Sequence, residues 1–180
     1  NAMADHVVAS IEAGKPDEAL IVGHSFGTSL ASILTARVLE RRPEWGGQDG
    51  PLALITLGET QCLLAFRNKP NWYHEELARF QAFPDFTWLD FSSPPDGACF
   101  AMINVLDFLP QPPEAMPRQL NAQFHKIFSE SHMDEARYYR MLMHFFYMQA
   151  SDNPQLDGDL YDFVLLVGGT QKARDRYGAR

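Results

Sequence analysis

The segment Gly23-His24-Ser25-Phe26-Gly27 carries the residue types that nucleophilic catalysis needs. It follows an apolar run over residues 19–22, typical of a strand buried on both faces, and precedes a stretch with apolar residues at helical spacing. A serine at such a strand-to-helix turn has a strained backbone and an isolated hydroxyl, and the N–H of Phe26 can donate to an oxyanion. The pattern predicts Ser25 as a nucleophile, with both flanking glycines keeping side chains off the turn. The alternative is a serine that only caps the helix.

The residues around this turn resemble the α/β-hydrolase superfamily, in particular its lipases and esterases. The resemblance is carried by residues 18–31, Glu-Ala-Leu-Ile-Val-Gly-His-Ser-Phe-Gly-Thr-Ser-Leu-Ala, and by residues 54–58, Leu-Ile-Thr-Leu-Gly. More distantly, residues 124–128 (Phe-His-Lys-Ile-Phe) and 144–147 (His-Phe-Phe-Tyr) are similar to the late part of bacterial lipase-like proteins. The resemblance implies a parallel sheet flanked by helices and a catalytic triad in the chain order serine, acid, histidine.

Three aspartates are candidates for the acid. Asp96 comes shortly after the third expected strand, where the resemblance places the acid, although Pro-Asp-Gly is also a common turn sequence. Asp90 lies nearer the end of that strand and is the main competitor, with Asp107 third. The sequence therefore favours Asp96 and leaves Asp90 open.

The chain holds six histidines, and none has a metal-binding spacing, so neither a metal nor another cofactor is expected. His6 and His74 break the implied chain order. His24 abuts the nucleophile, where adjacent side chains diverge, and is expected to support the site rather than to act as the base.

The base is sought among three late histidines. His144 lies in the segment Met-Leu-Met-His-Phe-Phe-Tyr-Met, where every other side chain is apolar or aromatic. A buried imidazole there needs a hydrogen-bond partner, and the carboxylate of Asp96 would provide one. The competing interpretation is a core histidine bonded to a backbone carbonyl, and His125 and His132 remain alternatives as the base.

The predicted function is a serine hydrolase of the lipase or carboxylesterase type, acting on an ester or thioester with an apolar acyl group. Its catalytic residues would be Ser25, His144 and Asp96, with the N–H of Phe26 as oxyanion donor. Weak activity is expected, because the early strands of the fold and the second oxyanion donor are not evident. A thioesterase or acyltransferase with the same nucleophile, and a catalytically silent interaction domain, are the alternatives.

The expected elements form a truncated α/β-hydrolase-like parallel sheet with flanking helices and a helical C-terminal half, either a C-terminal portion of a longer protein or a minimal version. Hydrophobic patterning and turn residues predict strands at 19–22, 52–57 and 86–91 and helices at 4–13, 26–42 and 71–83. Beyond a proline-rich loop at 109–117, helices are expected at 117–128 and 134–150, a short extended piece at 161–167, and a flexible tail at 169–180.

Composition limits the possible partners. The 180 residues carry a net charge of -8 and 46% hydrophobic side chains, which favours one folded domain over residues 1–180 and argues against nucleic-acid binding. No apolar run is long enough to span a membrane, and no signal-peptide pattern is present, so a cytoplasmic location is expected. Residues 1–2 resemble a tag scar, and the two cysteines are expected to be free thiols. Because the early strands are missing, a homodimer is predicted to cover the bare side of the sheet or the late helices.

Overall fold

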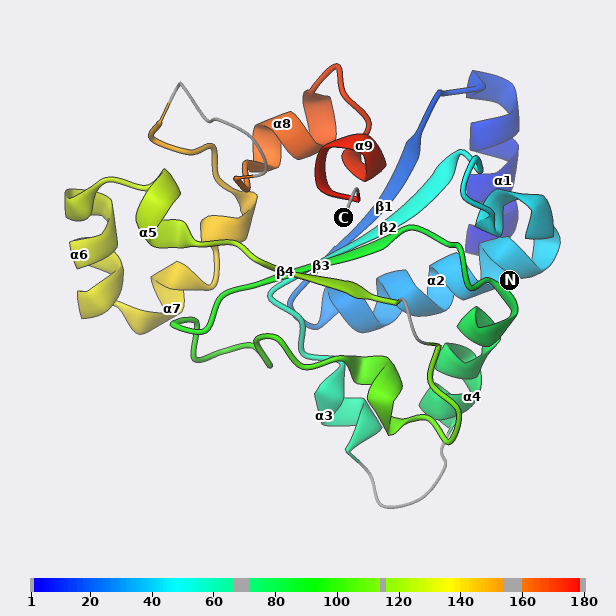
Figure 1. Cartoon of the computed structure of the whole chain (residues 1–180), viewed down its shortest axis with the longest axis horizontal. Helices are drawn as coiled ribbons and strands as arrows, with labels where there is room; N and C mark the ends of the chain where they lie inside the picture. Colours follow the sequence, from blue (N-terminus) through cyan, green and yellow to red (C-terminus); the bar gives the residue numbers. More distant parts are fainter. Residues whose placement is uncertain (1, 67–71, 114–115, 154–159, 179–180) are drawn as a thin grey trace.

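The fold is a layer of helices on each face of a central sheet, as seen in a computed structural model of the chain (Figure 1). The structure describes residues 2–66, 72–113, 116–153 and 160–178. None of the helices in these ranges has the length and apolarity needed to cross a membrane.

The sheet has four parallel strands in the order β1-β2-β3-β4. These strands are β1 (Ala19–His24), β2 (Leu52–Leu57), β3 (Trp88–Ser92) and β4 (Arg118–Asn121). All their carboxyl ends therefore lie at the same edge of the sheet, where loops gather functional side chains in parallel α/β folds. The helix α2 (Gly27–Arg41) connects β1 to β2, as the sequence predicted.

One face of the sheet is covered by α1 (Ala2–Gly14), α2, α3 (Cys62–Ala65) and α4 (Trp72–Ala78). Alternate residues of the central strands, such as Leu52, Leu54 and Trp88, point into this core. Short 3-10 turns at Pro43–Gly46, Arg79–Ala82 and Val105–Phe108 complete the layer. The expected helix over 71–83 corresponds to α4 and the 3-10 turn after it, and its first residue lies outside the described residues.

The opposite face packs against the later part of the chain. Its core takes Ile55, Leu57, Leu89 and Phe91 from the strands. Its helices are α5 (Phe124–Ile127), α6 (Glu130–Tyr138), α7 (Arg140–Met143), α8 (Phe163–Gly168) and α9 (Ala173–Tyr177), with a 3-10 turn at Phe146–Met148. Two cores on opposite faces explain why β2 and β3 are buried throughout.

The first strand differs from expectation. A strand buried on both faces was predicted at 19–22, but β1 is the edge strand, and most of its residues are only half-buried. Val22 is 38% exposed. The apolar run encodes the strand, but burial depends on neighbours that the run itself does not specify.

The helix predicted over 117–128 is wrong. Residues 118–121 form β4, which pairs with the free side of β3, and only the four-residue α5 follows it. The backbone groups along the side of β3 need partners, and this requirement outweighs the weak local preference of Arg-Gln-Leu-Asn.

The single helix predicted over 134–150 is broken into α6, α7 and the 3-10 turn at 146–148. The break allows His144, Phe146 and Tyr147 all to be buried, although they lie close together in the sequence. In one straight helix, successive residues lie about 100° apart around the axis, so these three side chains would point in different directions. Packing of this aromatic cluster therefore decides the local conformation.

Two predictions about the end of the chain are also wrong. Residues 161–167, expected to be extended, include most of α8, where the Asp162 side chain caps the helix by accepting from the N–H of Leu165 at 2.8 Å. The expected tail contains α9, whose residues Ala173 and Tyr177 are buried. The carboxylate of Glu18 accepts from the N–H of Ala173 at 2.6 Å, and this contact joins α9 to the start of β1.

Candidate active site

The turn after β1 has the geometry expected of a nucleophile elbow. Ser25 has a φ of 54°, in the left-handed region that side-chain-bearing residues rarely adopt. Its N–H donates to the carbonyl of Leu57 at 3.0 Å, and its own carbonyl accepts from the Thr28 hydroxyl at 2.6 Å. The strained residue is therefore fixed between the end of β2 and the first turn of α2.

The two glycines of the motif have different roles. A Cβ at Gly23 would lie 2.7 Å from both the Ala31 Cβ and the Gly27 carbonyl oxygen, so this position has no room for a side chain. A Cβ at Gly27 would meet nothing within 4 Å. The expectation that both glycines prevent collisions is correct for Gly23 and wrong for Gly27.

His144 and Asp96 form a buried pair. Nδ1 of His144 lies 2.7 Å from Oδ2 of Asp96, and both side chains are almost completely inaccessible to solvent. The other carboxylate oxygen accepts from the N–H of Ala98 at 3.0 Å. Burial acts to raise the pKa of Asp96, but the hydrogen bonds from His144 and Ala98 hold it below its ordinary value. Asp96 is therefore an ionised partner suited to orienting the imidazole.

His144 and Ser25 flank the same glycine at the carboxyl end of β2. Ser25 bonds to Leu57, and a Cβ on the next residue, Gly58, would lie 3.2 Å from Cε1 of His144. Gly58 itself has a φ of 53°. Among the described residues, the Ser25 hydroxyl makes no hydrogen bond to His144, a separation that is common in catalytic sites without substrate.

His24 connects the elbow to the His144 segment. Its Nε2 lies 2.7 Å from the carbonyl oxygen of His144, and the two rings have centroids 4.7 Å apart. Burial lowers the pKa of His24, although the His144 carbonyl acts in the opposite direction. A neutral His24 that donates from Nε2 ties the segment to the elbow, in agreement with the supporting place expected for it.

Residues 1–86 match the family model of Lipase (class 3). The match includes the elbow but ends before Asp96 and His144. This partial match supports a likeness to the lipases of the α/β-hydrolase superfamily over the part of the chain that holds the elbow. Searches of curated proteins and of solved structures found no match.

The other late histidines of the chain lie away from the elbow. His125 is exposed on α5. His132 is on α6, where its Nδ1 lies 3.1 Å from Oδ2 of Asp152 and its ring packs against Phe146. In the described residues, neither His125 nor His132 forms a hydrogen bond with Asp96, as His144 does.

The competing acids are also placed elsewhere. Asp90 points to the α2 side of the sheet, where it accepts from the hydroxyl of Thr56 at 2.6 Å. Thr56 in turn accepts from Nε1 of Trp88 at 3.0 Å, and Oδ2 of Asp90 has no hydrogen-bond partner among the residues that the structure describes. Burial raises the pKa of Asp90 to about 8. Asp107 is exposed in a 3-10 turn.

The oxyanion donor proposed from the sequence lies at the start of α2. Phe26 immediately precedes the first residue of this helix. The described backbone hydrogen bonds of the turn use the N–H groups of Ser25 and Thr28, and none uses that of Phe26. This N–H is therefore available to a ligand next to the Ser25 hydroxyl.

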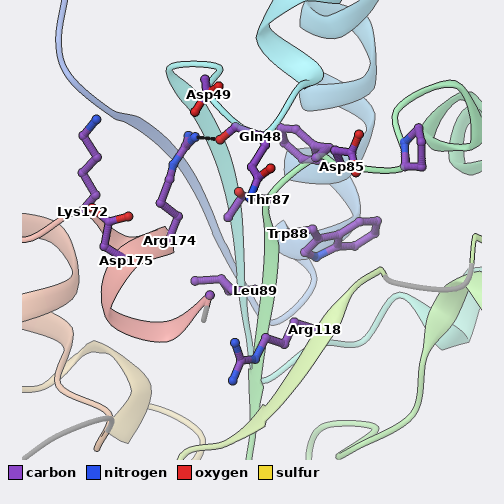
Figure 2. Close-up of a pocket in the computed structure, with 13 residues that line it drawn as sticks. Gln48, Asp49, Asp85, Thr87, Trp88, Leu89, Arg118, Lys172, Arg174 and Asp175 are labelled. Carbon is purple, nitrogen blue, oxygen red and sulfur yellow. Dashed lines mark hydrogen bonds between the residues drawn. The ribbon is translucent and has the colours of Figure 1, made fainter. Parts of the chain in front are cut away.

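A large hollow lies at the opposite end of the sheet (Figure 2). It has a volume of about 1000 Å³ and is lined by the first residues of β3 and β4, Trp88 and Arg118, and by Lys172 and Arg174. Figure 2 shows Arg174 bonded to the backbone of Gln48, just before β2. The parallel strands separate this hollow from the elbow, which follows the carboxyl end of β1.

Sequence reasoning missed two residues next to the buried pair. Tyr147 and Cys99 approach each other beside Asp96, with 3.6 Å between the Tyr147 hydroxyl and the Cys99 sulfur. Each lies three positions after one member of the pair, Tyr147 after His144 and Cys99 after Asp96. That spacing places side chains on the same side of a turn and was the available signal.

Proposed function

We propose that this chain is a serine hydrolase that cleaves carboxylic esters with an apolar acyl group. Ser25 is the nucleophile, His144 the general base and Asp96 the orienting acid. The observation that carries the proposal is the buried hydrogen bond of 2.7 Å between His144 and Asp96, beside the strained turn that holds Ser25.

The reaction follows from the positions of these groups. Nε2 of His144 takes the proton of the Ser25 hydroxyl while the Ser25 oxygen attacks the carbonyl carbon of the ester. The N–H of Phe26 stabilises the oxyanion, and the leaving alcohol departs with the proton held by His144. Water, deprotonated by His144, then attacks the acyl-serine, which releases the carboxylic acid and restores Ser25.

Asp96 has two effects on this cycle. Its bond to Nδ1 keeps the proton of the neutral imidazole on that nitrogen and leaves Nε2 free as the base. Its negative charge stabilises the imidazolium formed during attack. Because the N–H of Ala98 holds the other oxygen, the carboxylate keeps its orientation while His144 changes between imidazole and imidazolium.

The preference for an apolar acyl group is supported by the surface around the elbow. Phe26 is 56% exposed and Leu30, one turn further along α2, is 63% exposed. The partly exposed ring of Phe145 lies 5.7 Å from that of His24. An acyl chain that is attached to Ser25 and extends along α2 would cover these side chains and remove apolar surface from water.

A fluorophosphonate probe tests the proposal directly, because it phosphonylates an activated serine. We expect labelling of the wild-type chain and hydrolysis of a p-nitrophenyl butyrate reporter. Ser25→Ala should abolish both, whereas Ser10→Ala, which alters an exposed serine of α1, should retain both. Absence of labelling in the folded wild-type chain, or equal labelling in Ser25→Ala, would contradict the proposal and favour a catalytically silent domain.

We also propose that the chain forms a two-fold homodimer through β1. The strand is at the sheet edge, and its Val22 is exposed there. An unpaired strand edge is self-complementary, because its alternating N–H and carbonyl groups can pair with an antiparallel copy of the same strand.

A further inference from the structure

Tyr147 is packed between the elements of the proposed active site. It is completely buried in the 3-10 turn Phe146–Met148. Its ring stands nearly perpendicular to that of His144, at 85° with centroids 6.3 Å apart, and it fills the space beside Gly58 that a Cβ there would need. The ring is therefore fixed against the glycine that Ser25 and His144 flank.

The hydroxyl of Tyr147 points toward the loop after β3 that holds Asp96 and Cys99. It lies 3.6 Å from the sulfur of Cys99, which itself lies 3.6 Å from the carbonyl oxygen of Asp96. Burial and the nearby Cys99 and Asp96 all raise the pKa of Tyr147, so the phenol keeps its proton and remains a donor. The nearby Cys99 thiol helps to lower the pKa of the Asp96 carboxyl.

A carboxylate as deeply buried as Asp96 requires donors for its remaining lone pairs. His144 supplies one to Oδ2, and Ala98 supplies one to Oδ1. Tyr147 and Cys99 are neighbouring side chains that carry further protons. The Cys99 thiol donates to the main-chain carbonyl of Asp96, and the Tyr147 hydroxyl contacts the thiol.

We propose that the Tyr147 hydroxyl and the Cys99 thiol are a positioning pair that donates toward Asp96 and fixes the carboxylate in line with Nδ1 of His144. This inference rests on the proposed hydrolase function, because the pair acts through the acid and touches no substrate. Without the pair, Asp96 keeps its bonds to His144 and Ala98 but loses part of the support of its loop, so its alignment with Nδ1 is less exact while His144 carries the proton of Ser25. Turnover then falls while substrate binding stays the same.

Tyr147→Phe tests the proposal because it retains the ring and removes only the hydroxyl. We expect kcat for a p-nitrophenyl ester to fall about tenfold, with KM within about twofold of wild type, as for loss of one hydrogen bond to a charged group. The acidic limb of the pH profile should move to higher pH, because a carboxylate that has lost a donor attracts the imidazolium proton more strongly. Tyr177→Phe is the matched control, since it removes a buried hydroxyl that bonds to the carbonyl of Leu160 instead.

Cys99 provides a second variant that does not alter the aromatic core. Cys99→Ser retains a donor and should keep kcat within about twofold, whereas Cys99→Ala should lower it by several-fold. If Tyr147→Phe fails to fold by circular dichroism, this pair alone decides the outcome. Equal kcat values for Cys99→Ser, Cys99→Ala and wild type would overturn the role of the thiol.

A proton NMR readout separates this inference from the hydrolase proposal, because it needs no turnover. The hydrogen bond between His144 and Asp96 should give a strongly downfield Nδ1–H resonance that is lost in His144→Gln. We expect that resonance to shift in Tyr147→Phe and to stay in place in Tyr177→Phe. An unchanged resonance in Tyr147→Phe would overturn the positioning role, whether or not the chain hydrolyses esters.

Discussion

Asp90 and Asp96 lie six positions apart, but their carboxyl groups meet opposite environments. Asp96 is held by an imidazole and a backbone N–H, which keep its pKa low. Asp90 accepts a hydrogen bond from Thr56, and burial raises its pKa to about 8. Nearby Glu59, bonded to the N–H of Gln61 and to the thiol of Cys62, has a pKa raised by burial to about 7. The carboxyls of Asp90 and Glu59 on the α2 side of the sheet therefore keep their protons to a higher pH than that of Asp96 does.

These raised pKa values predict how stability depends on pH. In the unfolded chain both carboxyls lose their protons near pH 4, but in the folded chain Glu59 keeps its proton to about pH 7 and Asp90 to about pH 8. Between those limits the folded state binds more protons, so the free energy of unfolding falls as pH rises, by up to about 1.4 kcal/mol per pH unit for each group.

Asp90→Asn should flatten this dependence because it removes one of the two titrating groups. Urea unfolding at several values between pH 5 and pH 8 measures the slope. Asp85→Asn, at an exposed aspartate, should keep the wild-type slope. Parallel curves for Asp90→Asn and wild type would show that Asp90 is already ionised in the folded state.

At the scale of elements, the junction of β1 and α2 determines where the Ser25 hydroxyl stands. The strand and helix approach each other so closely at Gly23 that the Cβ of Ala31 and the backbone of Thr28 occupy the space of a side chain. Gly27, on the first turn of the helix, faces open space. The two glycines of one motif therefore respond differently to the same substitution.

Gly23→Ala should destabilise the protein by about 2 kcal/mol or more, because the added methyl group collides with backbone that cannot move without shifting α2. Gly27→Ala should be neutral or should stabilise by up to about 1 kcal/mol, as an alanine in a helix loses less conformational entropy. Chemical denaturation of the two variants measures the contrast. If Gly23→Ala and Gly27→Ala lowered the free energy of unfolding equally, the close packing of β1 against α2 at Gly23 would be contradicted.

At the scale of the whole molecule, the two edge strands of the sheet differ in length and composition. β4 has four residues, Arg-Gln-Leu-Asn, whereas β1 has six residues and a largely apolar composition. A shallow groove runs along β1, lined by Leu20 and Val22 and by Val167 at the end of α8. This is the surface on which we expect a second copy to pair.

Val22→Lys should convert the proposed dimer to a monomer, because a charge on a strand edge opposes pairing with another copy. Light scattering at micromolar concentration measures the mass. Val164→Lys, at an exposed position of α8, should leave the dimer intact. A wild-type monomer under these conditions would contradict self-association.

The sequence by itself determined the elbow and the elements around it. The apolar runs of β1 and β2, the helical spacing of α2 and the glycines between them are local features, and each specifies one conformation over a few residues. Asp96 was favoured from its place after β3, and His144 from a polar ring within an apolar segment. The structure brings those two residues together, while their catalytic roles stay a prediction until Ser25→Ala is assayed.

Only the tertiary structure decided the later half of the chain and the separation of Asp96 from Asp90. The strand β4 forms because β3 offers an unpaired edge, and α9 is held by Glu18, more than 150 positions earlier in the sequence. Whether a carboxyl in β3 or in the loop after it meets Thr56 or His144 depends on what packs against each side of the sheet. These contacts join distant parts of the chain, and local residue patterns carry no record of which distant partner they will meet.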